Sequence, residues 1–168
     1  MSYLLDANVF IQAKNLHYGL DFCPAFWEWI IEKNNAGKVY SIDKIADEIS
    51  AGTDELTNWI KDKKKTLFLE TDEKIANQFS IVSNWATNKD YEASAISTFF
   101  QVADFYLIAH ALNYEFSVVT HEIPSSSTRR TKIPNACIDL KLKYMTPYEM
   151  LRQERAKFVL GHNLGSLS

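Results

Sequence analysis

Four acidic residues lie beside apolar segments of the sequence, where an unpaired negative charge is costly. They are Asp6, Glu48, Asp104 and Glu122. Mg²⁺ prefers oxygen ligands and needs only one or two direct carboxylates, together with water and a substrate phosphate. A metal ion held in this way polarises a phosphodiester and activates the attacking water. If the four acids converge, they predict metal-assisted cleavage of a phosphodiester bond.

The first and last of these acids follow short apolar runs that predict buried strands. Residues 3–5 lead directly into Asp6, and residues 116–119 lead toward Glu122. In sheets built mostly of parallel strands, ligands bind just outside the carboxyl ends of the strands. We therefore expect Asp6 and Glu122 to emerge at the same edge of one sheet.

The rest of the chain predicts strands that alternate with helices, which is typical of an α/β protein with a mostly parallel sheet. Further strands are expected over residues 66–69 and 143–145, and helices over residues 9–13, 24–36, 42–51, 54–60, 71–82, 101–112 and from 147 onward. Ser41, Thr53 and Thr146 are expected to cap helices. Segment 123–134 contains serines and prolines and is predicted to be a loop.

The composition favours one globular domain, which we expect over residues 1–160 with a frayed tail over residues 161–168. The chain is 46% hydrophobic and 13% aromatic, which is enough for a packed core. No apolar run approaches the roughly 20 residues that span a bilayer, and the N-terminus lacks the pattern of a signal peptide. Cys23 and Cys137 do not have metal-binding spacing, so we expect reduced cysteines, no structural zinc and a cytoplasmic location.

A net charge of −3 argues weakly against a protein that coats nucleic acid, but local patches and metal ions decide phosphate binding. Arg129, Arg130 and Lys132 lie together in the predicted loop 123–134. These cations are candidates for binding the phosphates of RNA. The alternative, a solvated loop without a ligand, stays equally open.

Five segments of the chain resemble PIN domains, in the order and on the elements that those domains use. They are residues 4–10 (LLDANVF), 47–49 (DEI), 103–109 (ADFYLIA), 118–122 (VVTHE) and 146–151 (TPYEML). The resemblance covers nearly the whole chain and is nearest to bacterial VapC-type toxins and related stand-alone PIN proteins. It implies a PIN-like three-layer α/β/α fold with a mostly parallel central sheet.

The resemblance also implies a metal-dependent ribonuclease, often the toxin of a toxin–antitoxin pair and often a homodimer. By position, Asp6, Glu48 and Asp104 would hold Mg²⁺ or Mn²⁺. Asn8 would support the first acid, and Thr120 would lie beside the site. RNA is then the expected substrate, and an antitoxin protein is a candidate partner.

Each acid also has a purely structural explanation. Asp6 could simply end a strand, Asp104 could complement a helix dipole, and Glu48 could be the solvated neighbour of an inward-facing Asp47. Glu122 stands where the family usually has Asp, so it would bind a metal through water or act only as a turn residue. One shared site accounts for all four positions at once.

Three other functions stay open. A catalytically weak PIN module that binds RNA or a protein partner would account for Glu122. A phosphatase of the haloacid-dehalogenase type also places Asp after the first strand, but it needs a second Asp where this chain has Asn8. A flap-type nuclease shares the site chemistry, although the chain lacks the length for its additional elements.

Three further side chains are interpreted from their positions. His121 follows the predicted strand 116–119 and is a candidate substrate contact, with a surface histidine as the alternative. Trp27 and Trp29 are two residues apart and cannot share one helical face. We expect Trp27 in the core, and Trp29 is a candidate contact for a dimer or another partner.

Overall fold

Five parallel strands form the central sheet of the computed structural model, which describes residues 1–161. They are β1 (Tyr3–Leu5), β2 (Val39–Ile42), β3 (Phe68–Leu69), β4 (Ser117–Val119) and β5 (Tyr144–Met145). Their order is β3-β2-β1-β4-β5, so β1 lies between β2 and β4. A strand covered on both faces must be apolar throughout, which explains the three buried residues before Asp6. The predicted α/β class is confirmed.

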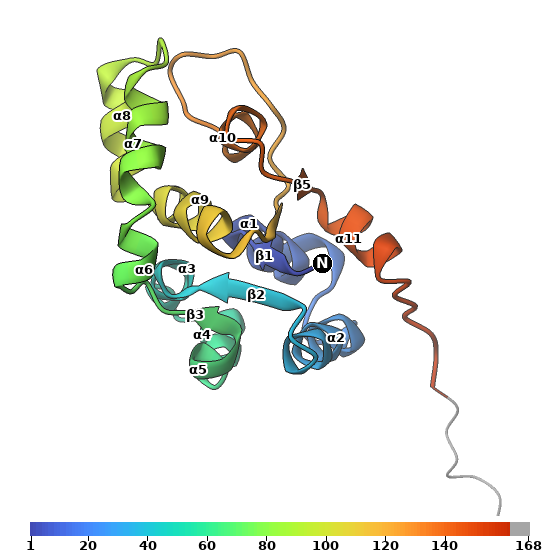
Figure 1. Ribbon diagram of the computed structural model, residues 1–168. Helices are drawn as coiled ribbons and strands as arrows, with labels where there is room; N and C mark the ends of the chain where they lie inside the picture. Colours follow the sequence, from blue (N-terminus) through green and yellow to red (C-terminus); the bar gives the residue numbers. More distant parts are fainter. Residues whose placement is uncertain (162–168) are drawn as a thin grey trace, which may run out of the picture.

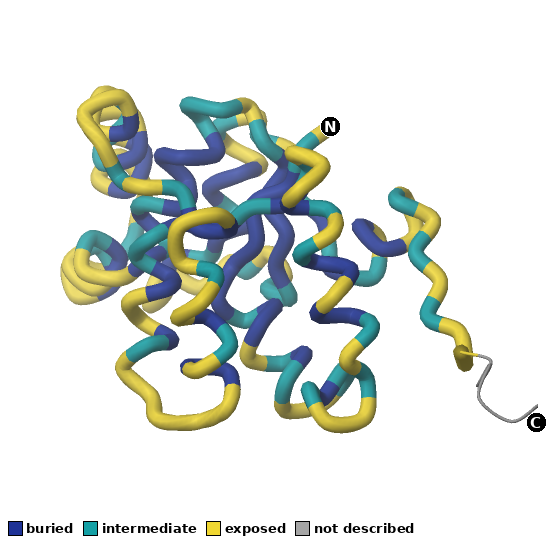
Figure 2. Tube along the Cα trace, turned by 90° about the horizontal axis from the view of Figure 1, so that it is seen from below, coloured by how far each residue is buried: buried dark blue, intermediate teal, exposed yellow. Residues whose placement is uncertain are grey.

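Helices cover both faces of this sheet and give three layers (Figure 1). On one side lie α9 (Ala103–Tyr114) and, beyond it, α6 (Glu73–Ala76), α7 (Phe79–Thr87), α8 (Ala93–Gln101) and α10 (Ile133–Asp139). On the other lie α1 (Ala7–Gln12), the π-helical turn η1 (Ala13–His17), α2 (Pro24–Asn35), α4 (Glu55–Lys61) and α5 (Lys64–Leu67). Helix α3 (Asp43–Ser50) follows β2, and α11 (Pro147–Gln153) follows β5. Buried residues gather along the sheet between these layers (Figure 2).

Aromatic side chains fill the space between the sheet and both helical layers. On one side the Trp27 and Trp59 rings lie 4.9 Å apart, and Phe10 lies 6.3 Å from Trp59. Trp27 is buried, as predicted. Trp29 is also buried in the core, so its side chain is not the surface contact that its sequence position suggested.

Strand β2 is the main element that the sequence did not predict. Ser41 was expected to cap a helix, but it is a buried strand residue whose hydroxyl donates to the Leu5 carbonyl (2.7 Å). A run of four residues is too short for its periodicity to distinguish a strand from the start of a helix. The next helix is capped by Asp54 instead of Thr53, since the Asp54 carboxylate accepts a backbone N–H inside α4.

The region after β4 contains both the predicted loop and an unpredicted helix. The loop ends at Lys132, and α10 begins at Ile133. Of two other expected features, one helix differs in detail and one helix cap is confirmed. The helix predicted over residues 71–82 is divided into α6 and α7. The capping box of Thr146 and Glu149 at the start of α11 is present.

Within residues 1–161 no single helix is long and apolar enough to cross a membrane. Helices α8 and α9 reach that length and composition only as a pair, and they are bent by 69° relative to each other. Most of the predicted tail, residues 162–168, lies outside the described residues.

Candidate metal centre

Asp6 is held rigidly at the carboxyl end of the central strand. Its backbone N–H donates to the Val119 carbonyl of β4 (3.0 Å), which extends the β1–β4 pairing by one residue. Its carboxylate accepts the Ala7 N–H at 2.6 Å and the Thr120 hydroxyl at 2.7 Å. The side chain is only 5% exposed. Both carboxylate oxygens therefore have a fixed direction before any ligand arrives.

Thr120 and Asn8, the two expected supporting residues, lie directly behind Asp6. The Thr120 hydroxyl donates to Asp6 and accepts from the Asn8 amide (3.1 Å) and from the Glu122 backbone N–H (3.0 Å). The Asn8 carbonyl oxygen accepts the His121 backbone N–H (3.1 Å). One network thus joins the end of β1, the start of α1 and the end of β4.

Asp104 lies in the first turn of α9 and faces the same edge of the sheet. Its pKa is raised to about 7, first by burial and then by the negative charges of Glu122 and Glu48, against opposition from Arg130 and Lys132. Burial also raises the pKa of Asp6, to about 8, with the Asp104 charge as the next cause. The acids are therefore close enough to repel one another through a poorly solvated space.

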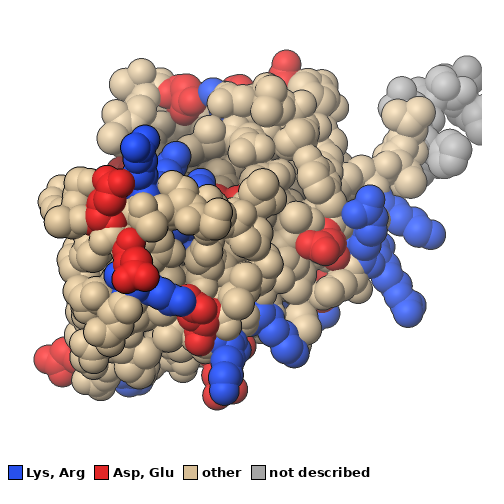
Figure 3. Space-filling view, turned by 90° about the horizontal axis from the view of Figure 1, so that it is seen from above, with Lys and Arg blue, Asp and Glu red and all other residues tan. Residues whose placement is uncertain are grey.

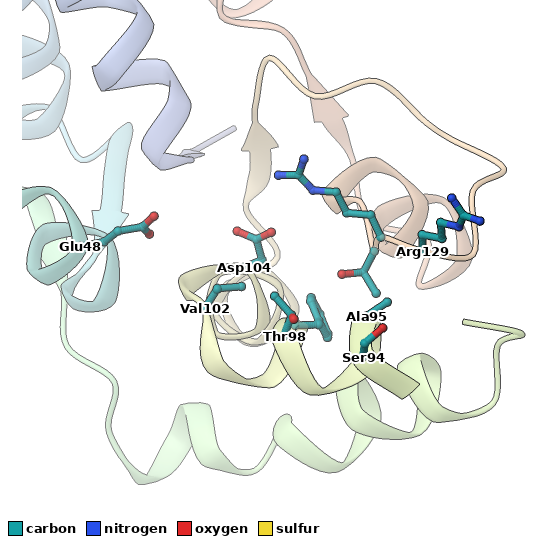
Figure 4. Close-up of a pocket in the computed structure, with 10 residues that line it drawn as sticks. Glu48, Ser94, Ala95, Thr98, Val102, Asp104 and Arg129 are labelled. Atoms are coloured by element: carbon teal, nitrogen blue, oxygen red, sulfur yellow. The ribbon is translucent and has the colours of Figure 1, made fainter. Parts of the chain in front are cut away.

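Glu48 stands across the opening from Asp104, on helix α3 (Figure 4). Its side chain is exposed at the mouth of the cavity, and partial burial of its carboxylate raises its pKa. The neighbouring Asp47 accepts a hydrogen bond from Lys64 at 2.6 Å on the outside of the protein. Of these two adjacent acids, the structure therefore directs Glu48 toward Asp104.

Glu122 reaches the edge of the site, but its carboxylate has protein partners. One oxygen accepts from the Lys132 ammonium (3.0 Å), and the other accepts the Ile133 backbone N–H at the start of α10 (2.9 Å). Glu122 thus closes the loop that the sequence assigned to RNA binding. Lys132 is occupied by the same contact.

The two arginines of the loop differ in their surroundings. Arg129 is highly exposed and lies 3.5 Å from the Glu92 carboxylate. Arg130 takes part in none of the ion pairs that involve residues 1–161, and its charge lowers the pKa of Asp104. Arg130 is therefore the loop cation that is free to meet a phosphate near the acids. Figure 3 shows acidic and basic side chains interspersed over most of one face, with a group of basic side chains near the C-terminal end of the described chain.

A cavity of about 420 Å³ lies beside the acids, between α8 and the loop (Figure 4). Its lining combines two acids, two arginines, three hydroxyls and an apolar wall. The lining residues are Glu48, Ser94, Ala95, Thr98, Phe99, Val102, Asp104, Arg129, Arg130 and Thr131. The contribution of α8 was not predicted from the sequence. Its signal is the pair Ser94 and Thr98, two hydroxyl residues one helical turn apart.

The His121 side chain belongs to a cluster of three rings with His17 and Tyr148. Its ring packs 5.5 Å from His17 and 5.7 Å from Tyr148, measured between ring centroids. The Tyr148 hydroxyl and a His17 ring nitrogen are hydrogen-bonded at 3.0 Å. Only the His121 backbone takes part in the network around Asp6.

The residues of the site fit a hard divalent cation. In the described part of the chain, no three Asp, Glu, His or Cys side chains already surround a common point as metal ligands would. Mg²⁺ does not require such a group, because one or two carboxylates and several waters suffice. Asp6 and Asp104 take part in none of the ion pairs found within residues 1–161. The charge of Asp104 raises the pKa of Asp6, and the charges of Glu122 and Glu48 raise the pKa of Asp104. A cation between them would stabilise both charged forms.

The all-parallel sheet and the helical layers on both of its faces form a PIN-like α/β/α fold, as the resemblance implied. The chain belongs to the family described as Domain of unknown function (DUF4411), whose model matches residues 3–158. No curated protein matches the sequence.

Two solved structures have a similar fold. The structure of VapBC2 from Rickettsia felis, bound to a DNA fragment from its promoter, matches with a TM-score of 0.54 and 12% identity. FitAcB from Neisseria gonorrhoeae matches with a TM-score of 0.52 and 16% identity. Each similarity covers 87% of this chain and 98% of the other. At these identities the comparisons establish the fold alone.

Proposed function

We propose that this protein is a metal-dependent endoribonuclease that cleaves single-stranded or structured RNA. The observation that carries the proposal is the convergence of Asp6 and Asp104, two poorly solvated carboxylates without a cation partner in the described chain. Holding like charges together is costly unless a cation joins them. An edge of a parallel sheet with a cavity beside it is where such a site acts on a ligand.

The residues have distinct roles in this proposal. Asp6, Asp104 and Glu48 would hold Mg²⁺ or Mn²⁺ between the edge of the sheet and the facing helix. When bound, such an ion polarises the phosphate and lowers the pKa of its water. Thr120 fixes the orientation of the Asp6 carboxylate, so that little reorganisation is needed during the reaction. Arg130 attracts the RNA phosphate to the same place.

We also propose an antitoxin as a partner of this protein. The resemblance to VapC-type toxins implies such a partner, and the shared fold with VapBC2 and FitAcB supports the proposal. An antitoxin would then block the ribonuclease. Co-expression with the product of an adjoining gene, followed by purification of a complex, tests this part separately from the chemistry.

A second candidate function is a PIN module that binds RNA with little or no cleavage. One observation favours it: both Glu122 oxygens are occupied, one by the Lys132 ammonium and the other by the Ile133 backbone N–H. In this case the acids would hold a cation that only helps to bind the RNA backbone.

One experiment separates the two functions. A labelled RNA pool is incubated with the protein in Mn²⁺, in Mg²⁺ and in EDTA, and cleavage products are counted. We expect cleavage with either metal and none in EDTA. Asp104→Asn should reduce cleavage by a factor of about 100 or more, the range seen when electrostatic stabilisation of a transition state is removed.

Asp47→Asn is the matched control, because Asp47 is an exposed acid next to Glu48 that contacts Lys64 outside the cavity. This variant should cleave as the unchanged protein does. Binding of the RNA pool without cleavage would favour the binding module. Cleavage by Asp104→Asn at the full rate would refute the proposed site.

A further inference from the structure

The cavity beside the acids has two kinds of lining on one helix. Ala95 and Phe99 are one turn apart on α8, and Val102, which is 37% exposed, follows the helix; we call these three lining residues the apolar floor. Ser94 and Thr98 precede Ala95 and Phe99 by one residue each, so their hydroxyls form a polar strip along the same wall. Neither the Ser94 nor the Thr98 side-chain hydroxyl forms a hydrogen bond with another residue in the described part of the chain.

The opposite wall comes from the loop and supplies positive charge. Arg129 and Arg130 line the cavity there, while Lys132 is withdrawn into its contact with Glu122. Figure 4 shows Arg129 on the far side of the cavity from Glu48, with Asp104 between them. The loop is fixed against α8, because the Glu92 N–H donates to the Thr128 carbonyl (2.9 Å) just before the helix begins.

This combination fits one nucleotide better than it fits a bare anion or an apolar ligand. A base has two apolar faces and a polar edge, so it can lie on an apolar surface while hydroxyls contact its edge. A guanidinium can stack on a base or bind a phosphate with two parallel hydrogen bonds. A volume of about 420 Å³ lies within the range of small-molecule sites.

The geometry points to a nucleotide subsite: the cavity takes the base next to the scissile phosphate, on the apolar floor, with Ser94 and Thr98 on its edge. This assignment rests on the proposed ribonuclease function and adds the part of the substrate that gives sequence preference. Helix α8 then selects the base, and the acids on α3 and α9 act on the adjoining phosphate. Arg130 holds the phosphate that links the two.

The test measures binding of mononucleotides, which contain no internucleotide bond to cleave. Isothermal titration calorimetry in Mg²⁺ compares AMP, GMP, CMP, UMP and inorganic phosphate. At least one nucleotide should bind about tenfold more tightly than phosphate. Ser94→Ala and Thr98→Val should each weaken that nucleotide by about 3- to 10-fold, the effect of removing one uncharged hydrogen bond, and should leave phosphate binding unchanged.

Ser97→Ala is the matched control, because Ser97 lies on the same helix and its hydroxyl accepts from Gln101 outside the cavity. It should bind nucleotides as the unchanged protein does. The inference is overturned if phosphate binds as tightly as all four nucleotides, or if Ser94→Ala and Thr98→Val behave like Ser97→Ala. Metal-dependent RNA cleavage is measured separately, so an active ribonuclease with either of these results would reject the subsite alone.

Discussion

The acidic residues of the site differ from one another in how the protein holds them. Asp6 is fixed by hydrogen bonds from Ala7 and Thr120, Asp104 takes part in no ion pair within residues 1–161, and Glu122 is occupied by the loop. A carboxylate that already accepts from an ammonium and a backbone N–H has less free capacity for a cation. The hydrogen bonds therefore favour Asp6 and Asp104 as metal ligands and give Glu122 the task of ordering the loop.

The first prediction distinguishes these roles at Glu122. Glu122→Ala should lower the free energy of unfolding by about 1–3 kcal/mol, because the Ile133 N–H and the Lys132 ammonium are left without their acceptor. Glu122→Gln keeps an acceptor for one of them and should be destabilised less. Urea unfolding of the three proteins measures both values.

The same variants test whether Glu122 binds metal. Glu122→Gln should keep the rise in melting temperature that Mn²⁺ causes, because the ion-binding acids are intact. If that rise disappears in Glu122→Gln, Glu122 is a ligand and its loop-ordering role is secondary.

Among the elements, α3 and α9 must hold Glu48 and Asp104 at a fixed separation. A partly buried tether joins them: the Thr71 hydroxyl donates to Asp43 at the start of α3 (2.6 Å) and lies 3.1 Å from a ring nitrogen of His110 in α9. Because Thr71 has one hydroxyl hydrogen, the His110 Nε2–H must donate to it. The other ring nitrogen then has no partner among the described residues.

The second prediction tests this tether. Thr71→Val should lower the free energy of unfolding by about 1–3 kcal/mol, since it leaves a buried imidazole without an acceptor. It should also reduce the melting-temperature rise caused by Mn²⁺, because the two acid-bearing helices are no longer joined. Thr87→Val is the control: Thr87 is an exposed residue of α7 whose hydroxyl donates only to carbonyls of its own helix. Equal melting curves for the two variants would contradict the tether.

The loop between β4 and α10 is the other element whose role can be measured. Replacing Arg129 and Arg130 by Ala should flatten the dependence of RNA affinity on salt, by about 0.7 in the logarithmic slope for each RNA phosphate that is no longer neutralised. Lys132 is excluded from this pair because it contacts Glu122. Filter binding at several salt concentrations gives the slope.

The control for this third prediction removes the same charge elsewhere. Lys141 and Lys143 are exposed residues just before β5, at the opposite edge of the sheet from the acids. Their double alanine variant should keep the original slope. A slope that both double variants change equally would show a general charge effect and no specific RNA contact at the loop.

For the whole molecule, two groups of poorly solvated residues make stability depend on pH in opposite directions. The pKa values of Asp6 and Asp104 are raised to about 8 and about 7, so the folded protein binds more protons than the unfolded chain above pH 3.8. Metal-free stability therefore falls as pH rises toward 8. Burial lowers the pKa of His110 to about 4, so protonation of this residue favours the unfolded chain below pH 6.5.

The fourth prediction follows from these signs. In EDTA the melting temperature should rise as pH is lowered from about 8.5 to about 6.5, as Asp6 and Asp104 take up protons. Below pH 6.5 this gain should be opposed as His110 becomes protonated in the unfolded chain. Saturating Mn²⁺ should raise the melting temperature most at the alkaline end, because the ion binds the charged acids of the folded state.

The Asp104→Asn variant tests the predicted melting behaviour at the alkaline end of this pH range. Without one of the repelling charges, it should melt no lower than the unchanged protein in EDTA at pH 8.5, and most of the Mn²⁺ effect should disappear. A large decrease in stability in EDTA would make Asp104 a structural residue of α9 and would contradict the metal centre.

The sequence by itself determined the α/β class, the position of β1 and β4, the capping box of α11 and the order of the acids along the chain. These features are local: each depends on periodicity or on neighbouring residues. Strand β2 was missed because four residues carry too little pattern, and α10 because nothing local distinguished it from the preceding loop.

Only the tertiary structure decided how the acids are used. Asp47 and Glu48 are adjacent in the chain, and the direction in which each points depends on how α3 packs against α4, α5 and α9. The partners of Glu122 lie ten and eleven residues away across a loop whose path the sequence does not specify. The nucleotide cavity joins α8 to that loop, so it exists only once both are packed. Long-range contacts of this kind depend on the closure of the whole chain around the sheet, and no local pattern encodes them.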